Sequence, residues 1–114
     1  MKMIKTTCCV DISPVMVEKY LYSNVDKIYK ILPLKESKEG TLGKYIRALV
    51  RELLGCQELI DAFQSDSRYL DVISVLMYMS SHIDSMNIDE VRSDVFRCIN
   101  LMKTLRRQHE SWVK

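Results

Sequence analysis

The sequence predicts an all-α protein: an antiparallel (up-down-up-down) four-helix bundle with a short N-terminal arm. Three observations predict it. Apolar residues recur at spacings of four and three in three long segments, which places them on one face of a helix. The 114 residues include only 3 Gly and 2 Pro, which favours long helices over many short strands. The later connections between segments are short, so neighbouring helices are expected to run antiparallel.

Residues 1–12 form the predicted arm, and residues 13–114 the predicted bundle domain. The arm is rich in β-branched residues, which favour an extended chain over a helix. They are Ile4, Thr6, Thr7, Val10 and Ile12. We expect the arm to lie across the bundle or on a partner.

The first helix is predicted over residues 14–32. Ser13 is placed to act as its N-cap, and Pro14 suits the first helical position. Pro33 is expected to stop the helix, since proline lacks a backbone N–H and clashes with the preceding turn. The predicted core stripe is Val17, Leu21, Val25, Ile28 and Leu32.

The second helix is predicted over residues 42–64, after a polar loop that Gly40 closes and with Thr41 as N-cap. Its apolar series keeps its phase through Gly55, which favours one continuous helix; the alternative is that Gly55 ends a helix as a C-cap. Glycine inside a helix costs about 1 kcal/mol relative to alanine, so we expect a closely packed neighbouring helix to compensate. The series is Leu42, Ile46, Leu49, Leu53, Cys56, Ile60 and Phe63.

The third and fourth helices are predicted over residues 67–86 and 89–112. Asp66 or Ser67 is expected to cap the third, while Asn87 and Glu90 have the spacing of a capping box before the fourth. The stripe of the third is Tyr69, Val72, Leu76, Met79, Ile83 and Met86. The stripe of the fourth is Val91, Val95, Cys98, Met102, Leu105, His109 and Trp112.

The composition argues against several classes of protein function. A formal net charge of +2 lacks the basic excess typical of nucleic-acid or membrane-surface binders. No apolar stretch approaches the length of a membrane span and no secretory signal is supported, so we expect a cytoplasmic protein without membrane contact. Its cysteines lack C-x-x-C spacing and are expected to be reduced thiols. They are Cys8, Cys9, Cys56 and Cys98.

No residue pattern names a chemistry. His82 and His109 are the only histidines, no E-x-x-H unit is present, and the glycines lack the spacing of a phosphate loop. We therefore predict a protein that is not an enzyme, with no catalytic residue, no cofactor and no metal. Adjacent Cys8 and Cys9 on the arm leave a redox or metal-binding element as an alternative.

Two helices carry apolar residues outside their core stripes, which predicts self-association. The third helix is apolar on nearly all sides, and the first has tyrosines seven residues apart. The alternative is a central helix covered by the arm and the loop. The candidate self-association residues are Leu70, Ile73, Met77, Tyr78, Tyr22 and Tyr29.

Basic residues gather at two places and would suit nucleic-acid contacts. The candidates are Lys44, Arg47 and Arg51 on the second helix, with Lys103, Arg106, Arg107 and Lys114 near the chain end. The alternative for the terminal group is a favourable interaction of cations with the helix macrodipole.

These features together predict a small non-catalytic helical accessory protein, of the kind found in bacteria, phages and mobile elements. We expect it to self-associate and to dock on another macromolecule, either a protein complex or an inhibited enzyme. The alternative function is a nucleic-acid-binding accessory factor that uses the basic faces of the second and fourth helices.

Overall fold

The structure, a computed structural model, describes residues 4, 6, 12–38 and 40–108, with side chains as far as residue 105. The described residues form six helices: α1 (Pro14–Tyr29), α2 (Ile31–Glu36), α3 (Leu42–Leu59), α4 (Asp61–Ser65), α5 (Ser67–His82) and α6 (Ile88–Gln108). No β-strand occurs among these residues, which confirms the predicted all-helical class. None of the described helices combines the length and the apolar character needed to cross a bilayer.

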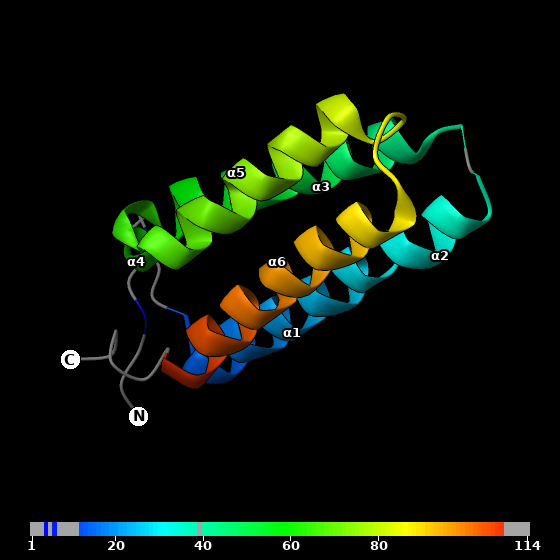
Figure 1. Cartoon of the computed structure of the whole chain (residues 1–114). Helices are drawn as coiled ribbons and strands as arrows, with labels where there is room; N and C mark the ends of the chain where they lie inside the picture. Colours follow the sequence, from blue (N-terminus) through cyan, green and yellow to red (C-terminus); the bar gives the residue numbers. More distant parts are fainter. Residues whose placement is uncertain (1–3, 5, 7–11, 39, 109–114) are drawn as a thin grey trace.

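The four long helices pack as two pairs, α1 with α6 and α3 with α5, and the pairs meet where α5 packs on α6. The helices of each pair run in opposite directions (Figure 1). The molecule is elongated, measuring 45 × 23 × 20 Å. α1 and α3 also lie next to each other, but their backbones approach at few points. Of the four contacts between neighbouring long helices, three are therefore formed by direct helix packing.

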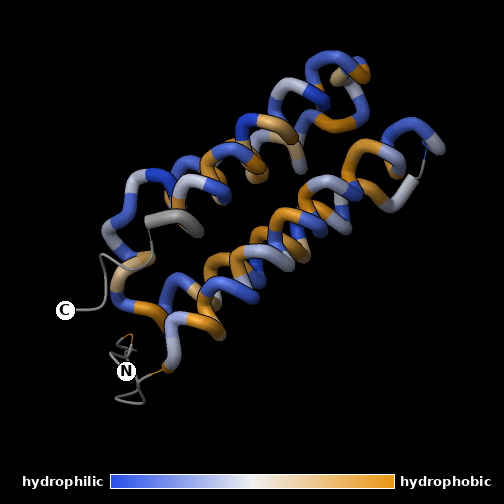
Figure 2. Tube along the Cα trace, turned by 90° about the horizontal axis from the view of Figure 1, so that it is seen from below, coloured by the Kyte–Doolittle hydropathy of each residue, from blue (hydrophilic) through white to orange (hydrophobic). Residues whose placement is uncertain are grey.

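The predicted apolar stripes of the long helices form the core. Hydrophobic and hydrophilic positions alternate along each helix, as the period of an amphipathic helix requires (Figure 2). Every predicted stripe residue of the third helix is buried, and so are the stripe residues of α6 up to Leu105; His109 and Trp112 lie outside the described residues. The stripe of α3 is buried from Leu42 to Leu53, and Cys56 is half-buried.

The predicted stripe of the first helix contains one error. Asn24 is fully buried, whereas Val25 is only partly buried against the core. The buried series Val17, Leu21, Asn24 and Ile28 keeps the spacing of four, three and four that the other helices show. A polar side chain therefore occupies a core position of α1.

The predicted N-terminal caps are mostly confirmed. The Ser13 hydroxyl accepts a hydrogen bond from the Met16 N–H, and the Asp66 carboxylate accepts one from the Arg68 N–H. Asn87 and Glu90 form the reciprocal capping box before α6, with bonds of 2.9 and 3.2 Å. Thr41 occupies the N-cap position of α3, but its side chain makes no capping bond.

Pro33 does not stop the first helix as predicted. The helix ends at Tyr29, Lys30 keeps right-handed helical backbone angles, and Pro33 is the third residue of α2. A proline is tolerated in the first turn because the N–H groups there have no acceptor within the helix. The chain therefore continues as helix to Glu36.

The second helix contains Gly55 in its interior, as predicted, but it does not continue to residue 64. It ends at Leu59, Ile60 adopts extended backbone angles, and α4 follows. Ile60 instead pairs with Thr6 of the arm in an isolated β-bridge. The local pairing with the arm takes the place of a helical turn at this residue.

The expected close approach at Gly55 is also wrong. A Cβ atom at Gly55 would meet nothing within 4 Å, whereas one at Gly43 would lie 3.5 Å from the Ser80 carbonyl oxygen. The glycine that permits close packing of α3 on α5 is therefore Gly43, at the start of α3.

The remaining differences between the predicted and the observed elements concern the ends of helices and the arm. The third helix ends at His82 instead of residue 86, and α6 begins at Ile88. Of the arm, Ile4 and Thr6 are described and both are buried; Ile4 exchanges two backbone hydrogen bonds with Ile12. These two arm residues lie against the core.

Candidate functional site

Two helices present exposed apolar side chains that could form a contact surface. Leu70 and Met77 of α5 are 42% and 52% exposed, and Leu54 of α3 is 40% exposed. We name these three side chains the α3–α5 patch. The buried residues Val50 and Ile73 lie on the same sides of α3 and α5 as these three side chains.

Helix periodicity and one close contact place the patch on a single surface. Gly43, Val50 and Leu54 are seven and four residues apart, so they share one side of α3. Leu70, Ile73, Met77 and Ser80 likewise share one side of α5. Because Gly43 approaches Ser80, these two sides face each other, and the exposed side chains flank the line where α3 meets α5.

Basic side chains border the patch. Lys44, Arg47 and Arg51 are all exposed on α3, and none of the three forms an ion pair within the described part of the chain. Lys103, which is also exposed, lies near the end of α6. α3 and α6 begin at the same end of the molecule, so the two predicted basic groups lie far apart (Figure 1). The side chains of Arg106, Arg107 and Lys114 lie outside the described residues.

The candidate self-association residues fall on three different surfaces. Ile73 is 5% exposed, so it belongs to the core and not to a surface. Tyr22 and Tyr29 are exposed on α1, where Tyr29 makes an edge-to-face contact with Phe96 of α6 at 6.4 Å between ring centroids. Tyr78, on another side of α5, stacks on His82 at 4.1 Å.

The described titratable side chains do not gather into a site of recognisable chemistry. No group of three or more His, Cys, Asp or Glu side chains close enough to share a metal ion occurs among the described residues. His82 is exposed, with Nδ1 2.9 Å from the Tyr78 carbonyl oxygen. Cys8 and Cys9 lie outside the described residues.

A cavity lies at the end of the molecule where α3 and α6 begin. It has a volume of about 710 Å³, with both charges and apolar groups in its wall. Lys35 crosses it, donating a hydrogen bond of 2.7 Å to the Ile83 carbonyl oxygen. The remaining lining residues are Glu36, Lys38, Gly40, Leu42, Asp84, Ile88 and Arg92.

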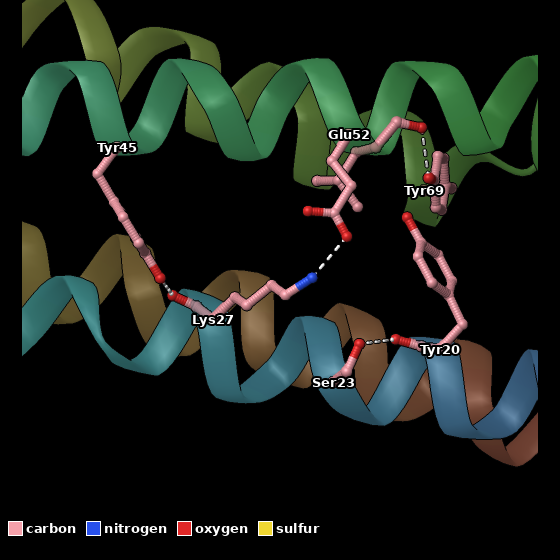
Figure 3. Close-up of polar contacts among 7 residues, drawn as sticks. Tyr20, Ser23, Lys27, Tyr45, Glu52 and Tyr69 are labelled. Carbon is pink, nitrogen blue, oxygen red and sulfur yellow. Dashed lines mark hydrogen bonds and ion pairs between the residues drawn. The ribbon is translucent and has the colours of Figure 1, made fainter.

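Long side chains span the space between α1 and α3, as Figure 3 shows. We name this space the α1–α3 seam. Lys27 Nζ lies 2.6 Å from Glu52 Oε1, and the Tyr45 hydroxyl donates a hydrogen bond of 2.7 Å to the Lys27 carbonyl oxygen. Both members of the ion pair are about two-fifths exposed, so solvent screens it. A groove of about 340 Å³ runs beside these residues, with Ala48 and Leu49 in its wall.

Polar groups continue along the seam into the interior. Asn24 is fully buried, and neither its Oδ1 nor its Nδ2 has a hydrogen-bond partner in the described structure. The buried hydroxyl of Tyr20 also has none. Each buried polar group left without a partner costs about 1–3 kcal/mol of stability. The interior beside the seam therefore contains buried polar groups that lower the stability of the closed structure.

Two further groups adjoin this polar interior. The Tyr20 and Tyr69 phenols point toward one another (Figure 3), and Tyr69 donates its hydrogen bond to the Leu53 carbonyl oxygen. Burial raises the pKa of both phenols. Burial also raises the pKa of the half-buried Cys56 thiol. All three groups are therefore neutral at physiological pH.

The burial of Asn24 does not follow from hydrophobicity, on which the predicted stripe of the first helix rests. A signal was present: Val17, Leu21, Asn24 and Ile28 have a more regular helical spacing than the series that contains Val25. Giving spacing priority over residue type would have placed Asn24 in the core.

A comparison of the chain with protein-family models, with curated proteins and with solved structures found no match.

Proposed function

We propose that this chain is a non-catalytic helical interaction protein that self-associates and docks on another macromolecule. Its frame, we infer, is an up-down-up-down four-helix bundle in which α2 and α4 extend α1 and α3. The pairing of α1 with α6 and of α3 with α5, joined through α5 and α6, supports this architecture. The free thiols of Cys56 and Cys98 suit a cytoplasmic location.

The observation that carries the proposal is the α3–α5 patch. Leu54, Leu70 and Met77 are large apolar side chains that remain two-fifths or more exposed along the line where two helices meet. Burying apolar surface against a partner is favourable by about 25 cal/mol for each Å² removed from water. A second copy offers an identical patch, and a two-fold axis would bring the two patches together.

Light scattering on the purified chain tests self-association. We expect a mass above that of one chain for the wild type, and the mass of a monomer for a variant with Leu70→Glu and Met77→Glu. Met16→Glu is the control, because Met16 is 60% exposed on α1, away from the patch. A monomeric wild type at every concentration up to its solubility limit would refute self-association.

Docking on another macromolecule is tested with the same variants. The bases beside the patch favour a partner surface that carries carboxylates. We expect a partner captured by the wild type from its host to be retained by Met16→Glu and lost from the patch variant. Retention by the patch variant would place the docking surface elsewhere.

A nucleic-acid-binding factor is the second candidate. It is supported by the row of exposed bases Lys44, Arg47 and Arg51 on α3, which form no ion pair with other described residues. Under this function, affinity for DNA or RNA should fall steeply with salt and should weaken in Arg47→Glu with Arg51→Glu. Absence of binding at about 50 mM salt would exclude it.

A further inference from the structure

The α1–α3 seam differs from the other three contacts between long helices. α1 packs on α6, α6 on α5, and α5 on α3, whereas α1 and α3 are connected mainly through long side chains. Directly packed helices gain dispersion energy along their whole contact. The backbones of α1 and α3 approach each other at few points, so we expect separating α1 from α3 to give up less packing than separating a directly packed pair.

Water would satisfy groups that the closed seam leaves unpaired. Within the described part of the chain, two side-chain atoms of Asn24 have no hydrogen-bond partner, and the Tyr20 hydroxyl is a third such group. These groups sit on the side of α1 that bears Lys27, since residues 20, 24 and 27 are four and three apart. Opening the seam would hydrate all three and relieve the penalty of their burial.

Three polar contacts among the described residues help to hold the seam closed. They are the ion pair of Lys27 with Glu52, the hydrogen bond from Tyr45 to the Lys27 carbonyl, and the bridge between Thr6 and Ile60. The ion pair is partly exposed, and such pairs contribute little. The bridge lies near the end of the seam, because Ile60 follows the last residue of α3.

We propose that the molecule opens along the α1–α3 seam while the contact between α5 and α6 stays closed, and that Asn24 sets how often it opens. Opening exposes the rest of the half-buried Cys56 side chain and the apolar stripes of α1 and α3. Cys98 is 0% exposed and lies on α6, one of the two helices whose contact stays closed, so we expect it to remain buried. This inference is independent of the α3–α5 patch, which lies on the outer side of the α3 and α5 pair.

Thiol labelling tests the proposal, with Cys98 as a control within the same molecule. The full chain is treated with a maleimide, and the modified peptides that contain Cys56 and Cys98 are resolved over time by mass spectrometry. We expect Cys56 to react faster than Cys98 and with a weaker dependence on sub-denaturing urea, as a local opening requires.

Substitutions along the seam should change the Cys56 rate alone. Asn24→Leu removes the unpaired amide and should slow labelling of Cys56 by about tenfold. Asn24→Val makes the same test with a smaller side chain, in case leucine does not fit. Lys27→Met breaks the ion pair at an exposed site and should speed labelling by about twofold to fivefold. Hydrogen exchange of the α1 and α3 amides should follow the same order.

Two results would overturn the proposal. One is a Cys56 rate that equals the wild-type rate in both folded Asn24 variants, which would mean that the thiol reacts without opening. The other is a parallel change of the Cys56 and Cys98 rates in every variant and in urea, which would mean that only global unfolding exposes either thiol.

Discussion

The Tyr69 hydroxyl donates a hydrogen bond of 2.5 Å to the carbonyl oxygen of Leu53, joining α5 to the backbone of α3 inside the molecule. The ring of Tyr69 is stacked on Phe63 with centroids 4.3 Å apart. Tyr20 points its own hydroxyl toward Tyr69 from α1, yet that hydroxyl has no hydrogen-bond partner in the described structure. The two neighbouring phenols therefore contribute differently to stability.

Removing the two hydroxyls one at a time should show this difference. Tyr69→Phe keeps the ring and its stacking but loses a buried hydrogen bond, so the free energy of unfolding should fall by about 0.5–1.5 kcal/mol. Tyr20→Phe removes an unpaired buried group and should leave that free energy unchanged or raise it. Urea denaturation of both variants gives the comparison, and equal losses would show that the Tyr20 hydroxyl is bonded.

The glycines of α3 give a second prediction. Gly55 lies inside the helix and faces open space, so Gly55→Ala should raise the free energy of unfolding by about 0.5–1 kcal/mol by reducing the freedom of the unfolded chain. Substitution by leucine distinguishes the two glycine positions. Gly43→Leu should destabilise, because α5 lies against that position, whereas Gly55→Leu should not. Thermal denaturation measures both, and equal tolerance of leucine would contradict the close approach at Gly43.

The core was predictable because burial follows helical spacing. The stripes of α3, α5 and α6 were identified as far as the structure describes them, since each keeps its period over several turns. Leu70 and Met77 were predicted as contact residues because they are apolar off the stripe, and the structure shows that they are exposed. The exposed Leu54 was not among the predicted residues, because its position beside them depends on α3 and α5 lying side by side, which spacing within one helix does not reveal.

The errors occur where tertiary contacts override local signals. Ile60 continues the apolar spacing of α3, yet its backbone is extended because the arm pairs with it. Pro33 has the local properties of a helix stop but occupies the first turn of a new helix. Asn24 is buried although its side chain is polar, because its place on α1 turns it toward the seam.

Lys38 provides a third prediction, since it follows the C-cap of α2 with φ of 57°. Side chains with a Cβ are strained in this left-handed region and glycine is not. Lys38→Gly should raise the free energy of unfolding by about 0.5–1 kcal/mol. Lys38→Ala is the control, because it removes the charge and keeps the strain. Equal gains from glycine and alanine would assign the effect to charge instead of backbone conformation.

Asp66 is the N-cap of α5, and its carboxyl group makes the free energy of unfolding depend on pH. Partial burial by itself would raise the pKa of its carboxyl group, but the hydrogen bonds and the charge of Arg68 outweigh burial and lower that pKa below its usual value. The Arg68 guanidinium lies 2.8 Å from Asp66 Oδ2. Because the folded pKa is the lower one, the resulting stability is fully present above the unfolded pKa of about 3.9 and is lost as the pH falls through the folded pKa.

Two substitutions at Asp66 separate the cap from the charge. Asp66→Ala removes both and should lower the free energy of unfolding at pH 7 by about 1–2 kcal/mol. Asp66→Asn keeps a capping side chain and loses only the charge, so its loss should be smaller. Denaturant unfolding at pH 7 and again well below pH 3.9 measures the gap between wild type and Asp66→Asn. That gap should close in acid because the wild-type carboxylate becomes protonated, and a gap of the same size at both pH values would show that Arg68 does not stabilise the charged form.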